Sequence, residues 1–353
     1  MRYLEHRVVP QRGTFRVGSI LVALLAMSTS RLSVADEYDL SPRNGPIQRA
    51  ASLTPGTKFK ECRECPEMVV VPAGEVSVKF ADEVNIADSG AVESIGRQVT
   101  IRIEKPFAVG IYHVTVAEFA AFVRATETEI PRGCLILDPN AMWIQHPTAD
   151  WTHPFFRQTP RDPVVCINWF DAHAYVDWLN QRVRARKRTE DVSRGGYRLL
   201  SVEEYAYLAQ GGVPVPKGMD RQWRNYANFG ADQCSPCGGA KRGMDKWFYT
   251  SPVGSFLPNR FGIYDIAGNV YTWFDDCAHK DFVDAPTDGS AWTNGGDCRV
   301  RVGDGGAFDD NYTNSDGSSV DLKEMLKSIS FGAWYAARAR NYANGLRVAR
   351  SLE

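Results

Sequence analysis

The chain has 353 residues, of which 44% are hydrophobic and 24% are charged, and its formal net charge is −1. This composition is typical of a globular protein with one large domain or two ordinary ones. A net charge near zero gives no support to a nucleic-acid or acidic-membrane partner. The many tryptophans, tyrosines and glycines favour a loop-rich fold around an aromatic core.

The first 35 residues predict a signal peptide. Four arginines precede an apolar stretch over residues 17–27, and Ser33-Val34-Ala35 suits a signal-peptidase site. We therefore expect cleavage after Ala35 and an exported protein, periplasmic or secreted, with no transmembrane span after cleavage. An uncleaved N-terminal anchor is the alternative, although the apolar stretch is short for a membrane span.

The cysteines of the chain are even in number, which favours disulfides in an exported protein. Spacing alone does not select a pairing. Two Cys-x-x-Cys pairs leave a four-thiolate zinc site as an alternative, although export and the long separation of the pairs count against it. The eight cysteines are Cys62, Cys65, Cys134, Cys166, Cys234, Cys237, Cys277 and Cys298.

Residues 36–65 are polar and rich in Pro, Gly, Lys and Arg, which predicts a linker that leads into a domain over 66–353. The apolar run at 68–74 predicts a buried strand that ends in a turn. Apolar residues alternate with polar ones at 99–103, which is typical of a half-buried strand.

Three helices are predicted from their start and stop signals. Capping boxes at Thr115–Glu118 and Ser201–Glu204 mark two helix starts. A third helix, with an apolar face, is expected from Asp171 into the basic run 182–188. A weaker helical pattern covers 320–329. Since strands and helices do not alternate as in a parallel sheet, we expect an α+β fold with a largely antiparallel sheet.

Several segments, in this order and spacing, carry a family resemblance. They include Cys62-Arg-Glu-Cys65 with the strand that follows it to Gly74, Asn259-Arg-Phe-Gly-Ile-Tyr-Asp-Ile-Ala-Gly-Asn269, and the segments at 106–115, 163–175, 197–205, 252–256 and 345–350. Together they resemble the formylglycine-generating enzyme, or sulfatase-modifying factor, family. The resemblance implies that family's variant of the C-type-lectin-like fold, which is α+β and loop-rich with short, mainly antiparallel sheets.

The family's known chemistry oxidises a cysteine of a sulfatase to formylglycine, with copper held by a pair of thiols. Counting onward from Gly305-Gly306-Ala307-Phe308, the resemblance places the two thiol positions on Asp310 and Ser315. Carboxylate and hydroxyl oxygens are hard ligands that do not suit Cu(I). We therefore expect no copper in this chain, and its catalytic residues, if it has any, remain unassigned.

The resemblance also implies structural calcium, which hard oxygen ligands would bind. A second family site loses its glutamate, which is Thr272 here, so we expect it to be weaker. An ordinary turn residue is the alternative role for Asn228. The implied ligands are Asn228, Phe229, Asp245 and Trp247 at the first site, and Asp265, Gly268 and Val270 at the second.

The resemblance implies that the cysteines pair in sequence order. The expected disulfides are Cys62–Cys65, Cys134–Cys166, Cys234–Cys237 and Cys277–Cys298. Among the histidines, His153 and His173 are interpreted as structural residues rather than metal ligands. The acidic loop from Asp304 to Asp321 is either a solvated loop or a binding surface for a cation or a basic partner.

Three functions are compatible with these observations. The first is an exported member of the family that binds or acts on a polypeptide without thiol-bound copper. The second is a non-catalytic C-type-lectin-like binding module, whose variable loops sit on a rigid core. The third is an enzyme with a site that the sequence does not reveal.

Overall fold

The computed structural model describes residues 53–86, 92–138, 142–185, 195–211, 227–229, 247–310, 328–329 and 333–352. The predicted signal peptide, most of the predicted linker, Cys234, Cys237, Asp245 and Ser315 lie outside this described part. Expectations that concern them are neither confirmed nor contradicted by the structure.

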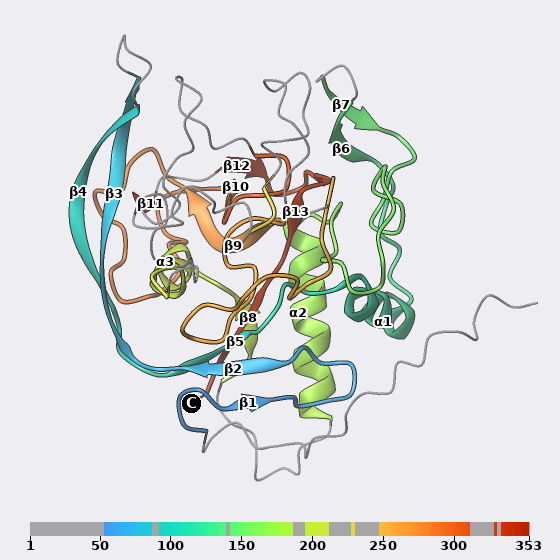
Figure 1. The fold of residues 1–353 in the computed structure, drawn as a ribbon, viewed down its shortest axis with the longest axis horizontal. Helices are drawn as coiled ribbons and strands as arrows, with labels where there is room; N and C mark the ends of the chain where they lie inside the picture. The colour runs from blue at the N-terminus through green and yellow to red at the C-terminus, as the bar shows by residue number, and fades with distance from the viewer. Residues whose placement is uncertain are drawn as a thin grey trace, which may run out of the picture. The chain divides into compact units, whose positions relative to one another are not determined.

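A five-stranded antiparallel sheet runs through the middle of the described fold (Figure 1). Its two faces bury different side chains because successive residues of a strand point to opposite sides. Met68 and Val70 enter one hydrophobic core, whereas Val69 and Val71 enter the other. The strands, in spatial order, are β1 (Lys58–Phe59), β2 (Met68–Val71), β5 (Phe107–Gly110), β14 (Val348–Ser351) and β8 (Tyr197–Leu199).

Three smaller sheets complete the strand arrangement. Within the described residues, two short strands pair in parallel, β13 with β9 and β11 with β3, and the other strand pairs are antiparallel. The sheets are β12 (Ala333–Ala336), β10 (Asp297–Asp304), β9 (Tyr271–Ala278) and β13 (Asn344–Gly345); β11 (Ser328–Ile329), β3 (Gly74–Ile86) and β4 (Val92–Ile103); and β6 (Cys134–Leu137) with β7 (Trp143–His146). The expected α+β fold with mainly antiparallel sheets is confirmed.

The three predicted helices are present, and capping boxes begin all of them. They are α1 (Val116–Thr126), α2 (Trp169–Arg184) and α3 (Val202–Ala209). Thr115 caps α1 and Ser201 caps α3, as expected. Helix α2 starts two residues earlier than expected because Asn168, and not Asp171, is its N-cap. Asp171 instead accepts a hydrogen bond from the Asn168 backbone, which completes the box.

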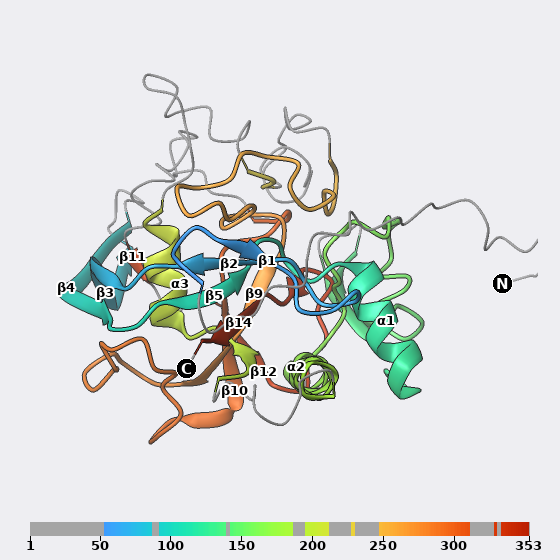
Figure 2. The ribbon, with the colours of Figure 1, turned by 90° about the horizontal axis from the view of Figure 1, so that it is seen from below.

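The helices cover opposite faces of the central sheet (Figure 2). Phe119 and Phe122 of α1 and Tyr175 of α2 pack into one core beneath β2, β5 and β14. Helix α3 packs into the other core together with the long β3–β4 hairpin. The site described below lies where β9 begins and β10 ends. The two cores hold these strands in place.

Two expectations about element boundaries need correction. The ordered fold begins before residue 66, because β1 pairs with β2 and buries Phe59 within the stretch expected to be linker. The weak helical pattern at 320–329 ends instead in strand β11, at Ser328–Ile329, which pairs in parallel with β3. In both places, pairing with another strand decides the local structure, and for β11 that strand lies far away in the sequence.

Three of the four expected disulfides are present, and the fourth falls outside the described residues. Cys62–Cys65, Cys134–Cys166 and Cys277–Cys298 are bonded. The two longer loops restrict the unfolded chain most, so each contributes about 3 kcal/mol to stability in the chain-entropy account. The Cys62–Cys65 bond removes these two thiols from the alternative zinc site.

A buried pair of carboxyl groups joins α3 to β9. Glu203 and Asp276 are both almost fully buried, and the Asp276 carboxylate accepts hydrogen bonds from the backbone amides of Val202 (3.0 Å) and Trp292 (2.8 Å). Burial raises the pKa of Asp276 to about 7. Burial, and then the charge of Asp276, raise the pKa of Glu203 well above its ordinary value.

This pair predicts a stability that falls as the pH rises. Below pH 4 both groups are protonated in the folded and unfolded chains; between about pH 4 and 7 only the folded chain retains the protons, so stability is lost as pH rises through the folded pKa values. We expect Glu203→Gln to lose less stability than the unmodified protein between pH 5 and 8, by about 1 kcal/mol or more. Urea denaturation across this pH range measures the difference. Glu129→Gln, at an exposed position, should leave the pH profile unchanged; identical profiles for all three proteins would contradict the prediction.

Candidate functional site

The loop that follows β10 forms the floor of the candidate site. Its backbone is fixed by two hydrogen bonds to the 268–269 turn, from Gly268 N to Gly305 O (2.7 Å) and from Phe308 N to Asn269 O (3.0 Å). Gly305 has a φ of 107° and Gly306 a φ of 71°, which glycine adopts without strain. The Gly-Gly pair therefore allows the sharp bend that carries the chain from β10 to Asp310.

Asp310, at the first of the family's thiol positions, is held by hydrogen bonds. The Tyr271 hydroxyl donates to one oxygen of its carboxylate, and the Ala307 amide donates to the other at 2.8 Å. Tyr271 comes from the start of β9, so the contact joins the loop to the sheet. The carboxylate thus has a structural role in closing this loop.

Two further carboxyl groups accompany Asp310. Burial, and then the charge of Asp310, raise the pKa of Asp309 to about 7, although a hydrogen bond with Tyr342 opposes this shift. Burial, opposed by a backbone hydrogen bond, brings the pKa of Asp304 to about 6, and the Asp310 charge adds to the rise. One Asp309 oxygen, Oδ1, is buried without a hydrogen-bond partner in the described structure. The site is therefore rich in oxygen acceptors.

Aromatic rings surround these carboxyl groups. Phe156 stacks on Tyr249 with ring centres 4.3 Å apart, and both rings contact Phe308, which in turn contacts Tyr342. The cluster meets the site at Phe308, which belongs to the same loop as Asp309 and Asp310. Its rings come from four separate segments of the chain.

Exposed apolar side chains continue the cluster onto the surface. Trp143 of β7 is 52% exposed and its ring lies edge-on to Tyr342, and Phe248 is 55% exposed and contacts Tyr249. Phe155, also exposed, precedes Phe156 in the same loop. Neighbouring exposed apolar groups of this kind mark surfaces that contact a partner. We call Trp143, Phe155 and Phe248 the aromatic rim.

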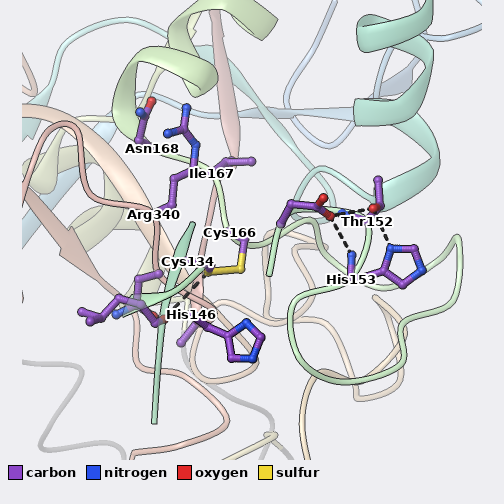
Figure 3. Close-up of a disulfide and its surroundings, with 12 residues drawn as sticks. Cys134, His146, Thr152, His153, Cys166, Ile167, Asn168 and Arg340 are labelled. Atoms are coloured by element: carbon purple, nitrogen blue, oxygen red, sulfur yellow. Dashed lines mark hydrogen bonds between the residues drawn. A yellow bond between two sulfur atoms is a disulfide. The ribbon is translucent and has the colours of Figure 1, made fainter. Parts of the chain in front are cut away.

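The disulfide Cys134–Cys166 holds the rim in place. It joins β6 of the two-stranded sheet to the segment that enters α2 (Figure 3). Leu135 adds two backbone hydrogen bonds. Its amide donates to Arg340 O (2.7 Å), and its carbonyl accepts from Tyr342 N (3.0 Å). These links place β7, and with it Trp143, beside the loop that carries Tyr342.

The histidines of the described part do not gather at the site. His153 contacts the Thr152 hydroxyl through Nδ1 at 2.8 Å, and Figure 3 shows it on a loop, whereas His146 is the last residue of strand β7. His173 Nε2 lies 2.9 Å from Asp275 on the α2 side of the sheet. Burial, and then the Arg347 charge, hold the pKa of His113 well below its ordinary value. These contacts support structural roles for His153 and His173.

The first expected calcium site is only partly within the described residues. Asn228 is buried, its Nδ2 donates to Tyr249 O at 2.8 Å, and its Oδ1 has no hydrogen-bond partner in the described structure. This bond places the Trp247–Tyr249 segment beside Asn228. A buried oxygen without a donor fits a hard cation such as calcium. Asp245 lies outside the described part, so the full ligand set is not tested.

At the second expected calcium site, hydrogen bonds already engage several groups. Asp265 Oδ2 accepts from Gly254 N at 2.8 Å, whereas Oδ1 is buried without a partner in the described structure. The Gly268 carbonyl accepts from the Val270 amide at 3.0 Å. Thr272, where the family has a glutamate, lies 2.8 Å from His113 Nε2. With Thr272 in place of the second carboxylate, and its hydroxyl engaged by His113, this site fits calcium poorly.

Comparison with known proteins shows the family to which the chain belongs. Residues 54–352 match the model of the sulfatase-modifying factor enzyme 1-like domain. This chain belongs to that family. The formylglycine-generating enzyme of Thermomonospora curvata is 29% identical over 233 residues, which cover 59% of this chain and 71% of the relative.

Two other similar proteins are not named as active formylglycine-generating enzymes. The inactive C-alpha-formylglycine-generating enzyme 2 of Mus musculus is 30% identical over 237 residues, which cover 59% of this chain and 68% of that protein. PvdO of Pseudomonas aeruginosa is 29% identical, with a TM-score of 0.61 and coverage of 85% of this chain and 100% of PvdO. The fold is thus the formylglycine-generating-enzyme variant of the C-type-lectin-like fold, as the resemblance implied.

Sequence reasoning located the Gly305–Asp310 loop but missed the groups around it. Tyr271 and Tyr342 contact the two carboxylates, and Trp143 and Phe248 extend the site to the surface. The apolar run Met142-Trp143-Ile144, whose side chains are exposed, is a signal in the sequence that could have pointed to the rim.

Proposed function

We propose that this protein is an exported member of the family that binds a polypeptide at the aromatic rim, without thiol-bound copper. The observation that carries the proposal is the hydrogen bonding of the Asp310 carboxylate. Its two carboxylate oxygens accept hydrogen bonds from Tyr271 and from the loop backbone, at the position where the family's first thiol is expected. Carboxylate oxygens do not fit Cu(I), so we derive no copper step for this site.

The rim supports a polypeptide as the ligand. Large aromatic side chains that are partly exposed are the groups that contribute most to binding at protein interfaces. The β7 strand beside them is the outer strand of its two-stranded sheet, and its residues are mostly exposed. Two of the relatives are named for generating formylglycine or for being inactive in that reaction. A family member that binds a polypeptide but does not oxidise it is compatible with both names.

Binding of peptides to the full chain tests this proposal. We expect an array of cysteine-containing and random peptides to capture the unmodified protein, and Trp143→Ala and Phe248→Ala to weaken capture about tenfold each. Phe170→Ala is the matched control, because Phe170 is a similarly exposed aromatic residue on α2. Equal capture of all four proteins, or none above background, would refute binding at the rim.

Export is part of the same proposal. The N-terminal pattern and the three disulfides support it, since disulfides persist in oxidising compartments. Within the described residues, no helix has the length and hydropathy needed to cross a bilayer. N-terminal sequencing of the exported protein should begin at Asp36, and recovery of the intact chain from the cytoplasm alone would contradict this expectation.

Calcium is proposed as a structural ligand at Asn228. A ligand that binds only the folded chain raises its stability, by about 2.7 kcal/mol at about one hundred times the dissociation constant. We therefore expect the melting temperature to rise with calcium and to fall with a chelator, and the response to be lost in Asn228→Ala. Asp265→Asn, at the poorer site, should retain most of the response. A melting temperature that is insensitive to calcium would exclude the proposed ligand.

A further inference from the structure

A cavity lies on the side of the fold where β8 and β14 meet the 288–291 loop. Its volume is about 460 Å³, which is within the usual size range of small-ligand sites. The first residue of β5, the start of α3 and the C-terminal Ser351 and Leu352 also line it. Figure 2 shows β8, β14 and the C-terminus gathered on this side of the fold.

The cavity is distinct from the aromatic rim. Strand β9 runs from the Asp310 loop to the cavity: Tyr271 at its start contacts Asp310, and Asp275, four residues later, lines the cavity. At about 3.3 Å per residue, this separation is roughly 13 Å along the strand. The inference below therefore does not depend on the proposed polypeptide site.

Part of the wall is apolar and suits a hydrocarbon chain. These side chains come from the end of β4, the start of β5, strand β8, the 288–291 loop and the C-terminus. They are Ile103, Pro106, Phe107, Leu199, Ala291 and Leu352.

Arg198, a cation in the cavity wall, is already neutralised by an ion pair. Arg198 donates to both oxygens of Glu204 at 2.6 Å, and its Nε donates to Ser351 Oγ at 3.1 Å. Glu204 is buried, so the pair forms a closed ion pair in the cavity lining. Neither residue is left to bind a ligand of opposite charge.

Two hydroxyl donors of the wall are also engaged. Ser201 donates to Gly289 O at 2.9 Å, and Ser290 donates through its hydroxyl to Asp288 at 2.6 Å. The hydrogen bonds from Ser290 hold the pKa of Asp288 below its ordinary value, so this carboxylate is ionised at neutral pH. What the wall presents to a ligand is therefore mainly acceptors.

Three carboxylates remain to receive a cation. Asp288 uses only Oδ1 for Ser290, and Asp275 uses only Oδ1 for His173. Glu104 is exposed and also lines the cavity. Apart from the Arg198–Glu204 pair, the lining holds these three carboxylates and one cation, Lys105. The lining thus has an excess of negative charge, which Arg301 reduces only beside Asp275.

We propose that this cavity binds an aliphatic ammonium or guanidinium group, with its charge at Glu104, Asp275 and Asp288 and its methylene chain against the apolar wall. Long basic side chains combine such a charged head with an apolar stem. The same chemistry comes from two sources, a lysine or arginine side chain of a polypeptide and a free polyamine, and binding experiments separate them.

Calorimetry on the full chain provides the test, with Nα-acetyl-lysine methylamide, spermidine and the neutral Nε-acetylated lysine derivative as probes. We expect a cationic probe to bind with a dissociation constant of about 1 mM or tighter, and more weakly as salt is added. The neutral derivative, which keeps the stem but lacks the charge, should not bind.

Matched variants locate the site. Glu104→Gln, Asp275→Asn and Asp288→Asn should each weaken binding by roughly fivefold, which corresponds to about 1 kcal/mol. Glu129→Gln, an exposed glutamate outside the cavity, should leave it unchanged. Tighter binding of the lysine derivative than of spermidine identifies a polypeptide as the source, and the reverse order identifies a polyamine.

The opposite results overturn the inference. Binding of the neutral derivative as strong as that of the cationic probes would show that charge is not recognised. Cationic binding that the three cavity variants do not change would place it elsewhere on the protein. Absence of binding of every probe at 10 mM, roughly the weakest range that calorimetry measures, would also refute it.

Discussion

Loaded with copper and offered a peptide that contains a sulfatase motif, this protein should form no aldehyde above the level of a no-protein control. Copper-dependent oxidation of the family type needs thiolates that bind Cu(I). Asp310 provides a carboxylate at the first thiol position, and Tyr271 and the Ala307 amide already occupy it. Every cysteine in the described part of the chain is bonded in a disulfide. Mass spectrometry of the peptide measures the aldehyde directly.

The formylglycine-generating enzyme of Thermomonospora curvata is the positive control for this assay. Asp310→Cys combined with Ser315→Cys tests the physical reason, because it returns two soft ligands to the family's positions. We expect that variant to bind Cu(I) more tightly than the unmodified protein, whether or not it oxidises the peptide. Copper-dependent aldehyde formation by the unmodified protein would show that the active site lies elsewhere.

Local patterns in the sequence predicted local structure well. The capping boxes at Thr115 and Ser201 begin helices, as expected, since a capping box depends on residues only three positions apart. The start of α2 was misplaced because the first residue of an equivalent box is Asn168 rather than Ser or Thr. Asparagine is an equally good N-cap, so the sequence did contain this signal.

Features that join distant segments were predicted only through the family resemblance, or not at all. The resemblance supplied the disulfide pairs and the position of Asp310. The contacts of Asp310 with Tyr271 and of Asp309 with Tyr342 connect residues more than thirty positions apart. No periodicity in the sequence encodes such contacts, because they depend on how β9 and β10 pack. The same holds for β11, whose strand character comes from pairing with β3.

Replacing Arg350 with Met should cost about 3–5 kcal/mol of the free energy of unfolding, the largest stability effect that we expect from a single change. The Arg350 and Glu61 side chains are 1% and 5% exposed, and two hydrogen bonds join them, at 2.5 Å from Nε and 3.0 Å from Nη2. Loss of the guanidinium leaves the Glu61 carboxylate buried without its counter-charge. Guanidinium chloride denaturation of the two proteins measures the difference.

A double replacement separates loss of the charge pair from loss of packing. Arg350 lies on β14 and Glu61 lies next to the Cys62–Cys65 disulfide, so the pair links the last strand to the first described segment of the fold. If the unpaired carboxylate causes the cost, Glu61→Gln should recover part of the stability when it is added to Arg350→Met. The two changes should therefore be strongly non-additive. Additive effects, or a cost below about 1 kcal/mol for Arg350→Met alone, would show that this ion pair does not hold β14 to the segment around Glu61.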